Sequence, residues 1–224
     1  MIPIVGLGGK SGSGKTTVLA GLIGELKRRG LRVGAIKHTR HPATLDQPGK
    51  DTAVLHEAGA VAVALTGAGQ VGMYMRVTEP WSPAAVAMLF PEVDLILVEG
   101  CHEADIPRLW VLRRGVAEEP PEAKGIIGYV TDLSLRTELP VFGFDEIGRI
   151  ADLMEDYVRR LGPRREVKLF VNERPVRIKP FIKDFFLNTI SAMVASLRDT
   201  GAARRILILL EKPGGESGPE NGDD

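Results

Sequence analysis

The sequence contains little cysteine, no net charge and no long hydrophobic run. Among its 224 residues Cys101 is the single cysteine, which excludes a disulfide framework and a zinc site made of several thiolates. Lysine and arginine together number 29, as do aspartate and glutamate, so the formal net charge is zero. This balance argues against a protein that coats nucleic acid or an anionic membrane, and we expect neither as a partner.

Targeting segments are also missing from the pattern. No apolar run approaches the roughly 20 residues that a membrane-spanning helix needs. The first ten residues, MIPIVGLGGK, lack the charged start of a signal peptide and lead directly into a motif. We therefore expect a cytoplasmic protein.

Glycine is the residue in excess, with 26 among 224 residues against a typical share of roughly 7%. Six of these glycines lie between Gly6 and Gly21, around the segment GKSGSGKT at 9–16, which matches G-x-x-x-x-G-K-[ST] at every fixed position. An apolar run at 2–7 precedes this segment as a strand would, and helical periodicity at 16–29 follows it. These flanking elements are the context that a phosphate-binding loop requires.

The chemistry of such a loop assigns roles to its residues. Glycines let successive backbone N–H groups, here around Gly12, Ser13 and Gly14, point inward at phosphate oxygens, and the helix N-terminus attracts the same anion. In this motif Lys15 reaches the β- and γ-phosphates and the Thr16 hydroxyl ligates Mg²⁺. The sequence therefore predicts nucleotide binding.

Lys10 has two interpretations. A lysine after the first glycine resembles the signature lysine of deviant P-loop ATPases, which crosses a dimer interface to the partner's nucleotide. The paired glycines that usually follow that lysine are replaced here by Ser11 and Gly12, which favours an ordinary exposed lysine.

The order of the expected elements indicates the fold class. A strand at 2–7, a helix at 16–29 and a strand at 31–37 form a βαβ unit, which implies a parallel sheet. The nearly all-apolar DLILV at 94–98 is typical of the centre of such a sheet. We expect an α/β fold of the P-loop NTPase type, with a mostly parallel sheet in three layers. Further strands are expected at 61–65, 71–77, 108–112, 126–130 and 141–144, helices at 83–90 and 145–161, and an irregular loop at 38–58.

A basic segment marks the expected domain boundary. RRLGPRREVK at 159–168 holds five basic residues, a glycine and a proline. We expect a nucleotide-binding domain at 1–162, a small ββαβ appendage at 166–212 and a disordered acidic tail at 213–224. Within the appendage the pattern predicts a hairpin of 167–172 with 176–179, a helix at 181–198 and a strand at 206–210.

A phosphate loop needs a carboxylate at the end of a neighbouring central strand. DLILVEG offers Asp94 and Glu99, which lie five residues apart, or roughly 16 Å along a strand, and so cannot share one ion. Ligands bind at the carboxyl ends of parallel strands. We therefore favour Glu99 at the metal or its water and interpret Asp94 as a strand-start residue.

The polar segment 38–51 supplies further candidates. Asp46 and Asp51 are candidate Mg²⁺ ligands, and Lys50 is a candidate phosphate contact. His38 and His41 are candidates for contact with a substrate or an oxyanion, although structural roles explain them equally well.

Asp132 follows the expected strand at 126–130. An aspartate at the end of a strand can accept hydrogen bonds from guanine N1 and N2, which adenine cannot match. This would favour GTP as the nucleotide; the alternative is a simple turn aspartate.

Three stretches of the sequence, GGKSGSGKTT, IKHTRHPATLDQPGKDTAVLHEAGA and DLILVEGCHEADIPRL, resemble the MobB family of nucleotide-binding accessory proteins in molybdopterin-guanine dinucleotide biosynthesis. The resemblance spans about residues 1–160, and the middle stretch is its most specific part. It implies a P-loop GTPase-like fold, GTP with Mg²⁺, weak hydrolysis, a homodimer, and a partner nucleotidyltransferase that joins GMP to molybdopterin.

The resemblance also implies roles for single residues. It assigns the Mg²⁺ pair to Asp46 and Glu99, beside Thr16, and we expect Lys15 and Glu99 to be the catalytic residues. The phosphate-loop roles of the family fall on Gly12, Gly14, Lys15, Thr16 and Thr17.

The sequence departs from the family pattern in two places. It has Lys10 where members often have an apolar or aromatic residue, and Thr39, Arg40 and His41 where they often have a run of histidines. Two alternative functions stay open. One is a synthetase or kinase of the dethiobiotin-synthetase type, whose metal strand also ends in Val-Glu-Gly. The other is a nucleotide-binding adaptor that does not hydrolyse.

Overall fold

The protein, seen here as a computed structural model, divides into two compact units, Ile2–Gly162 and Pro163–Asp224. The structure describes residues 2–39, 49–90, 93–100, 105–161, 167, 169–171, 174–176, 178–198, 206 and 208.

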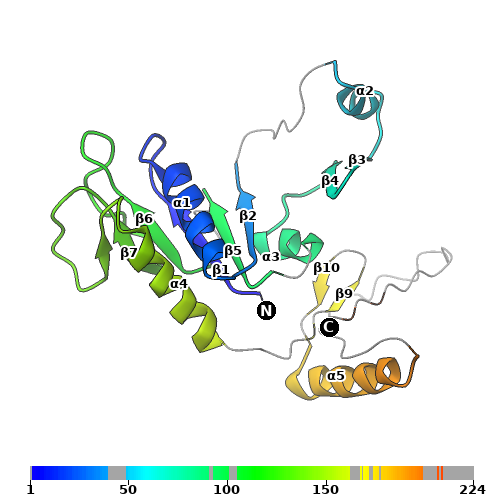
Figure 1. Ribbon diagram of the computed structural model, residues 1–224. Coiled ribbons are helices and arrows are strands. Elements are labelled where there is room, and N and C mark those ends of the chain that lie inside the picture. Colours follow the sequence, from blue (N-terminus) through cyan, green and yellow to red (C-terminus); the bar gives the residue numbers. More distant parts are fainter. Residues whose placement is uncertain are drawn as a thin grey trace, which may run out of the picture. The chain divides into compact units, whose positions relative to one another are not determined.

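The first unit is built on a six-stranded sheet in which every pairing is parallel (Figure 1). The spatial order of its strands is β2-β5-β1-β6-β7-β8. The strand that precedes the glycine-rich segment, β1, therefore lies between β5 and β6. The strands are β1 (Ile4–Gly8), β2 (Val33–Lys37), β5 (Leu95–Glu99), β6 (Arg108–Val111), β7 (Ile126–Val130) and β8 (Val141–Phe142).

Helices cover both faces of this sheet, because alternate residues of β1 and β5 point to opposite sides. On one face Val5 and Leu7 pack with α1 (Lys15–Arg28) and α4 (Ile147–Leu161). On the other face Ile4, Ile96 and Val98 pack with α3 (Pro83–Val86) and the 3₁₀-helix η1 (Ala87–Leu89). The predicted α/β fold with a mostly parallel, helix-covered sheet is confirmed.

The predicted helix at 83–90 is divided between α3 and η1. Ser82 caps α3, because its Oγ accepts a 3.2 Å hydrogen bond from the N–H of Ala85. This is the cap that a serine before a proline predicts.

A separate two-stranded antiparallel sheet joins β3 (Ala62–Gly67) and β4 (Gln70–Met75). It is preceded by α2 (Asp51–Glu57), so the expectation of irregular chain throughout 38–58 is wrong at 51–57. The sequence DTAVLHE contains no glycine or proline, and Asp51 in the first turn complements the helix dipole. His56 makes an edge-on ring contact with Tyr74 at 4.3 Å between ring centroids, which joins α2 to the hairpin.

The second unit contains the antiparallel pair β9 (Leu169–Val171) and β10 (Arg174–Val176), followed by α5 (Pro180–Ala195). A hairpin followed by a helix is the expected order, but the second strand lies at 174–176 rather than at 176–179. Of the strand expected at 206–210 only residues 206 and 208 are described, and the expected tail at 213–224 lies outside the described residues. Within the described part of the chain, no helix has the length and apolar character needed to cross a membrane.

Candidate functional site

The glycine-rich segment forms a tight loop between β1 and α1. Gly9, Gly12 and Gly14 have positive φ angles of 144°, 78° and 94°. A β-carbon on Gly9 would lie 2.6 Å from the carbonyl oxygen of Val111, and one on Gly14 would lie 3.2 Å from the guanidinium of Arg113. Gly9 therefore requires glycine both for backbone conformation and for space, and Gly14 for backbone conformation.

Ser13 lies inside this loop. Its side chain is fully buried, and its backbone N–H donates a 3.2 Å hydrogen bond to the carbonyl of Lys10. Its Oγ has no hydrogen-bond partner among the described residues. Since buried hydroxyls are normally satisfied, an unpaired one here fits a loop that closes around a polar ligand such as a phosphate.

Lys15 begins α1, and its Nζ donates a 2.8 Å hydrogen bond to the carbonyl of Lys10 across the loop. Partial burial lowers the pKa of this ammonium below its ordinary value; the charge of Glu99 opposes that shift and the charge of Lys37 adds to it. A carbonyl is a weaker partner for an ammonium than a phosphate oxygen. Lys15 is therefore positioned to exchange this bond for one to an anion.

Thr16 and Glu99 meet beside the loop. The Thr16 hydroxyl donates a 2.9 Å hydrogen bond to Oε2 of Glu99. The parallel register of β1 and β5 pairs Leu7 with Glu99, which brings the end of β5 to the start of the loop. Hydroxyl and carboxylate oxygens are ligands that Mg²⁺ prefers, so these two residues fit such an ion.

The second carboxylate of this strand region lies at its opposite end, as expected. Asp94 precedes β5 and accepts hydrogen bonds from Arg32, from the backbone N–H at 2.8 Å and from Nη2 at 3.0 Å. Of the predicted Mg²⁺ pair the structure thus places Glu99 beside Thr16, whereas Asp46 lies outside the described residues. In the described part of the chain no group of three or more His, Cys, Asp or Glu residues is arranged to hold a metal ion by itself.

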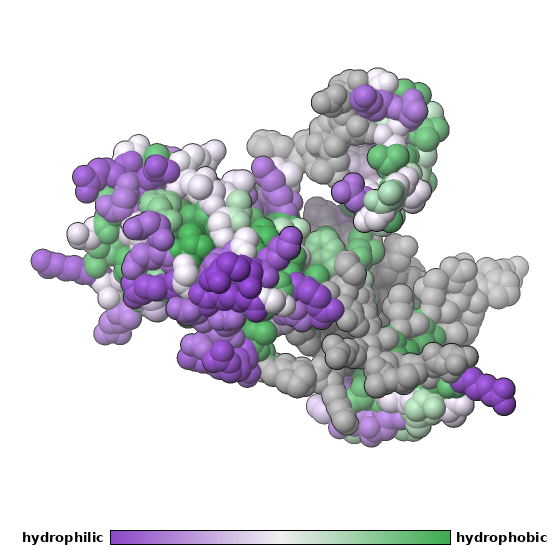
Figure 2. Space-filling model, in the orientation of Figure 1, coloured by the Kyte–Doolittle hydropathy of each residue, from purple (hydrophilic) through white to green (hydrophobic). Residues whose placement is uncertain are grey.

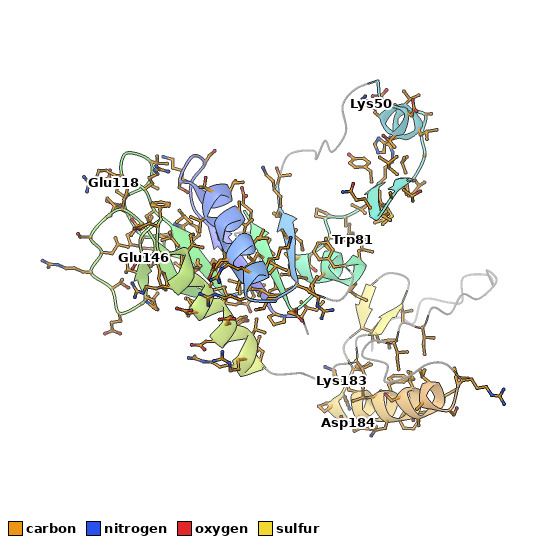
Figure 3. The ribbon with its side chains drawn as sticks, in the orientation of Figure 1. Lys50, Trp81, Glu118, Glu146, Lys183 and Asp184 are labelled. Carbon is orange, nitrogen blue, oxygen red and sulfur yellow. The ribbon has the colours of Figure 1, made fainter. Side chains whose placement is uncertain are left out.

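Two candidates from the polar segment lie at α2. Lys50 precedes this helix and Asp51 begins it (Figure 3). His38 follows β2, and its N–H donates a 2.8 Å hydrogen bond to the carbonyl of Glu99, so it lies at the edge of the sheet that carries the loop. His41 falls outside the described residues.

Asp132 follows β7 at the same edge of the sheet. Its Oδ1 accepts a 2.9 Å hydrogen bond from the backbone N–H of Arg114. The carboxylate therefore has a structural task in holding the turn after β6, and a role in recognising a base stays a prediction.

Lys37, which the sequence analysis did not single out, also lies near the phosphate loop. It ends β2 and pairs in register with Glu99 of β5, and its charge is close enough to affect the pKa of Lys15. The available signal was its place at the end of the second strand of a βαβ unit. The carboxyl ends of neighbouring parallel strands meet at one edge.

Arg113 and Phe144 were also missed, because neither belongs to a motif. The Arg113 guanidinium lies over the Phe144 ring, 5.1 Å from its centroid. Both side chains approach Gly14, since a β-carbon there would lie 3.2 Å from Nη1 of Arg113 and 3.3 Å from Cε1 of Phe144. Among the described residues, the surroundings of the loop thus include the basic side chains of Lys15, Lys37 and Arg113 and the carboxylate of Glu99.

Comparison with known proteins agrees with this architecture. The family model MobB, described as molybdopterin guanine dinucleotide synthesis protein B, matches residues 4–132. The molybdopterin-guanine dinucleotide biosynthesis adapter protein of Haemophilus influenzae is 34% identical over 160 residues, which cover 70% of this chain and 90% of that protein. The protein of the same name from Escherichia coli is 32% identical over 170 residues, which cover 71% and 95%.

Solved structures show the same fold. Bacillus subtilis MobB matches with a TM-score of 0.55 and 26% identity, covering 69% of this chain and 96% of that one. The MobB homologue from Bacillus stearothermophilus matches with a TM-score of 0.51 and 24% identity, covering 70% and 98%. The family model spans more than half of the chain, and two relatives exceed 30% identity over most of their length. The chain therefore belongs to the MobB family.

Proposed function

We propose that this protein is an adapter in molybdopterin-guanine dinucleotide biosynthesis that binds GTP with Mg²⁺ at the phosphate loop and hydrolyses it slowly. The observation that carries the proposal is the hydrogen-bonded pair of Thr16 and Glu99 beside Lys15, in a chain of the MobB family. Relatives at 34% and 32% identity are named as adapter proteins of this synthesis. A cytoplasmic location is part of the proposal.

The residues of the loop have distinct tasks in this proposal. Backbone N–H groups from Gly12 to Thr17 and the ammonium of Lys15 hold the phosphates. Thr16, Glu99 and Asp46 would hold Mg²⁺, which when bound neutralises phosphate charge. Asp132 accepts hydrogen bonds from guanine, which supports GTP over ATP.

Lys15 and Glu99 are the two residues to which we assign catalytic roles. Lys15 stabilises negative charge on the phosphate oxygens that it contacts. Glu99 already accepts a hydrogen bond from Thr16, and its other oxygen can orient a water near the phosphates. Because the same carboxylate has to bind the Thr16 hydroxyl and to orient the water, we propose slow rather than rapid hydrolysis.

The proposed partners are molybdopterin and a nucleotidyltransferase that joins GMP to it, together with a second copy of this chain. The homodimer is supported by the two-stranded sheet of β3 and β4. This sheet and the residue before it expose large apolar side chains (Figure 2). Leu65 of β3 is exposed at 65%, Val71 of β4 at 75%, and Val61, directly before β3, at 72%. An isolated two-stranded sheet with such a surface is marginally stable alone and gains from pairing.

Equilibrium binding of GTP, ATP and molybdopterin to the purified full chain, with and without Mg²⁺, tests the proposal. We expect Mg²⁺-dependent GTP binding, weaker ATP binding and slow turnover. Lys15→Ala should abolish GTP binding, because it removes a charge-assisted phosphate contact. Lys27→Ala changes an exposed lysine in the last turn of α1 and is the matched control. Micromolar GTP binding retained by Lys15→Ala would overturn the site.

The same measurements separate the two alternatives. A synthetase or kinase of the dethiobiotin-synthetase type would turn over rapidly once its small acid substrate was supplied. An adaptor that uses nucleotide only as a structural element would bind GTP tightly with no hydrolysis above the rate in solution.

A further inference from the structure

Arg113 lies two residues after the end of β6 (Arg108–Val111), the strand that borders the phosphate loop. Strand β6 pairs with β1, with Gly8 opposite Trp110, so the two strands end side by side. The loop turns over the end of β6, where the carbonyl of Val111 lies against Gly9. The pairing of β1 with β6 therefore places the residues that follow β6 beside the phosphate loop.

The backbone of Arg113 is held firmly in this place. Its N–H donates a 2.9 Å hydrogen bond to the carbonyl of Ala117, and its carbonyl accepts 3.0 Å hydrogen bonds from the N–H groups of Val116 and Ala117. The neighbouring N–H of Arg114 is bound by Asp132. Glu118, at the end of the same turn, accepts a 2.7 Å hydrogen bond from the N–H of Gly115 (Figure 3).

The side chain of Arg113 is positioned by an aromatic ring. Its guanidinium lies 5.1 Å from the centroid of Phe144, and its Nη1 lies against Gly14, the residue before α1. Stacking occupies a face of the guanidinium and leaves the N–H donors, which lie in its plane, available for hydrogen bonds. The donors of Arg113 are thus presented beside the loop on a supported side chain.

No carboxylate among the described residues forms an ion pair with Arg113. Several other arginines of this unit do have acidic partners. Arg29 binds Glu25, Asp152 and Glu155, and Arg32 binds Asp94. A stacked arginine without an acidic partner, next to a loop that contains the unpaired buried hydroxyl of Ser13, is suited to an anionic ligand.

We propose that Arg113 is a phosphate-binding residue whose guanidinium donates hydrogen bonds to the phosphate chain of the bound nucleotide across Gly14. This inference rests on the proposed function, because it requires a nucleotide in the loop. It adds to the site a cation from the turn after β6, beside Lys15 at the start of α1. Phe144 acts as the positioning residue for Arg113.

The test compares Arg113→Ala and Arg113→Lys with the matched control Arg114→Ala, which removes the adjacent exposed arginine of the same turn. The ligands are GTP and inorganic pyrophosphate, the second measured by displacement of a fluorescent GTP analogue. We expect Arg113→Ala to weaken both ligands by about ten- to hundredfold, the usual effect of one hydrogen bond to a charged group. Arg113→Lys should bind with intermediate affinity, and Arg114→Ala should bind as the wild type does.

The outcomes distinguish this proposal from the proposed function. If the wild type binds GTP and Arg113→Ala binds it equally well, the role of Arg113 is overturned and the nucleotide site stands. If Arg113→Ala loses affinity for GTP but not for pyrophosphate, Arg113 contacts the base or ribose, and the phosphate role is overturned. A wild type that binds neither ligand would overturn both proposals. Thermal unfolding of each variant separates lost contact from lost folding.

Discussion

The Thr16 hydroxyl donates a hydrogen bond of 2.9 Å to Oε2 of Glu99, although 83 positions separate the two residues in the chain. Thr16 belongs to the first turn of α1 and Glu99 to the last position of β5. The bond therefore joins the phosphate loop to the neighbouring strand, at the place where a P-loop protein holds its Mg²⁺.

Replacement of this carboxylate should remove the metal dependence of nucleotide binding. Glu99→Gln keeps the size of the side chain but loses its charge, so we expect the gain in GTP affinity on adding Mg²⁺ to fall by about tenfold or more. Binding without Mg²⁺ should persist, because Lys15 and the loop are unchanged. Titration calorimetry with and without Mg²⁺ measures both quantities.

Glu122→Gln is the control for this experiment, since Glu122 is an exposed carboxylate outside the helices and strands. An unchanged Mg²⁺ dependence in Glu99→Gln would show that the metal is held elsewhere in the chain.

Two glycines near the start of the chain should respond to alanine in opposite ways. Gly14 has a φ of 94° and faces Arg113 and Phe144, so Gly14→Ala should cost about 1–2 kcal/mol of folding free energy and abolish GTP binding. Gly24 lies within α1, and a β-carbon there meets nothing within 4 Å. Gly24→Ala should therefore stabilise the protein by about 0.5–1 kcal/mol and leave binding intact.

Urea unfolding and GTP titration of both variants provide the check. If Gly14→Ala is as stable as the wild type and binds GTP normally, the loop conformation described here is not the one that holds the nucleotide.

The central strands and the phosphate loop could be predicted because their signals are local. Leu95, Ile96, Leu97 and Val98 are fully buried, and an all-apolar run is what such burial selects. The pattern of the loop is likewise contained in eight consecutive residues. Local patterns were weaker for the short helix α2, whose seven residues follow a segment rich in polar and turn-forming residues.

Lys37 and Arg113 could not be predicted in the same way, because they reach the site through strand order. Lys37 meets Glu99 since β2 pairs with β5, and Arg113 meets Gly14 since β6 pairs with β1. A single sequence shows where strands occur but not which strands are neighbours. Asp132 illustrates the same limit, since its bond to Arg114 depends on the pairing of β6 with β7.

Asp132 allows the base preference to be tested without disturbing the turn. Asp132→Asn can still accept the hydrogen bond from the N–H of Arg114, but its amide cannot accept from both guanine N1 and N2. We expect the preference for GTP over ATP to decrease by about tenfold, with unchanged thermal stability. Competition between the two nucleotides measures the preference. Equal preference in the variant and the wild type would mean that another residue reads the base.

The ion pairs of Glu25 at the C-terminal end of α1 should make stability depend on pH in the acid range. Hydrogen bonds from Arg28 and Arg29 lower the pKa of Glu25 from 4.5 to about 2. A carboxylate with a lowered pKa contributes stability that is complete above its unfolded value and is lost as the pH falls toward the folded one. Glu25→Gln should therefore be less stable than the wild type at neutral pH, and this difference should shrink as the pH falls from 4.5 toward 2.

Because Glu25 is near the surface, added salt should also reduce the difference in stability between Glu25→Gln and the wild type. Urea unfolding at a series of pH values, with Glu122→Gln as the control, measures it. A difference that stays constant across this range would mean that Glu25 acts through packing rather than through its charge.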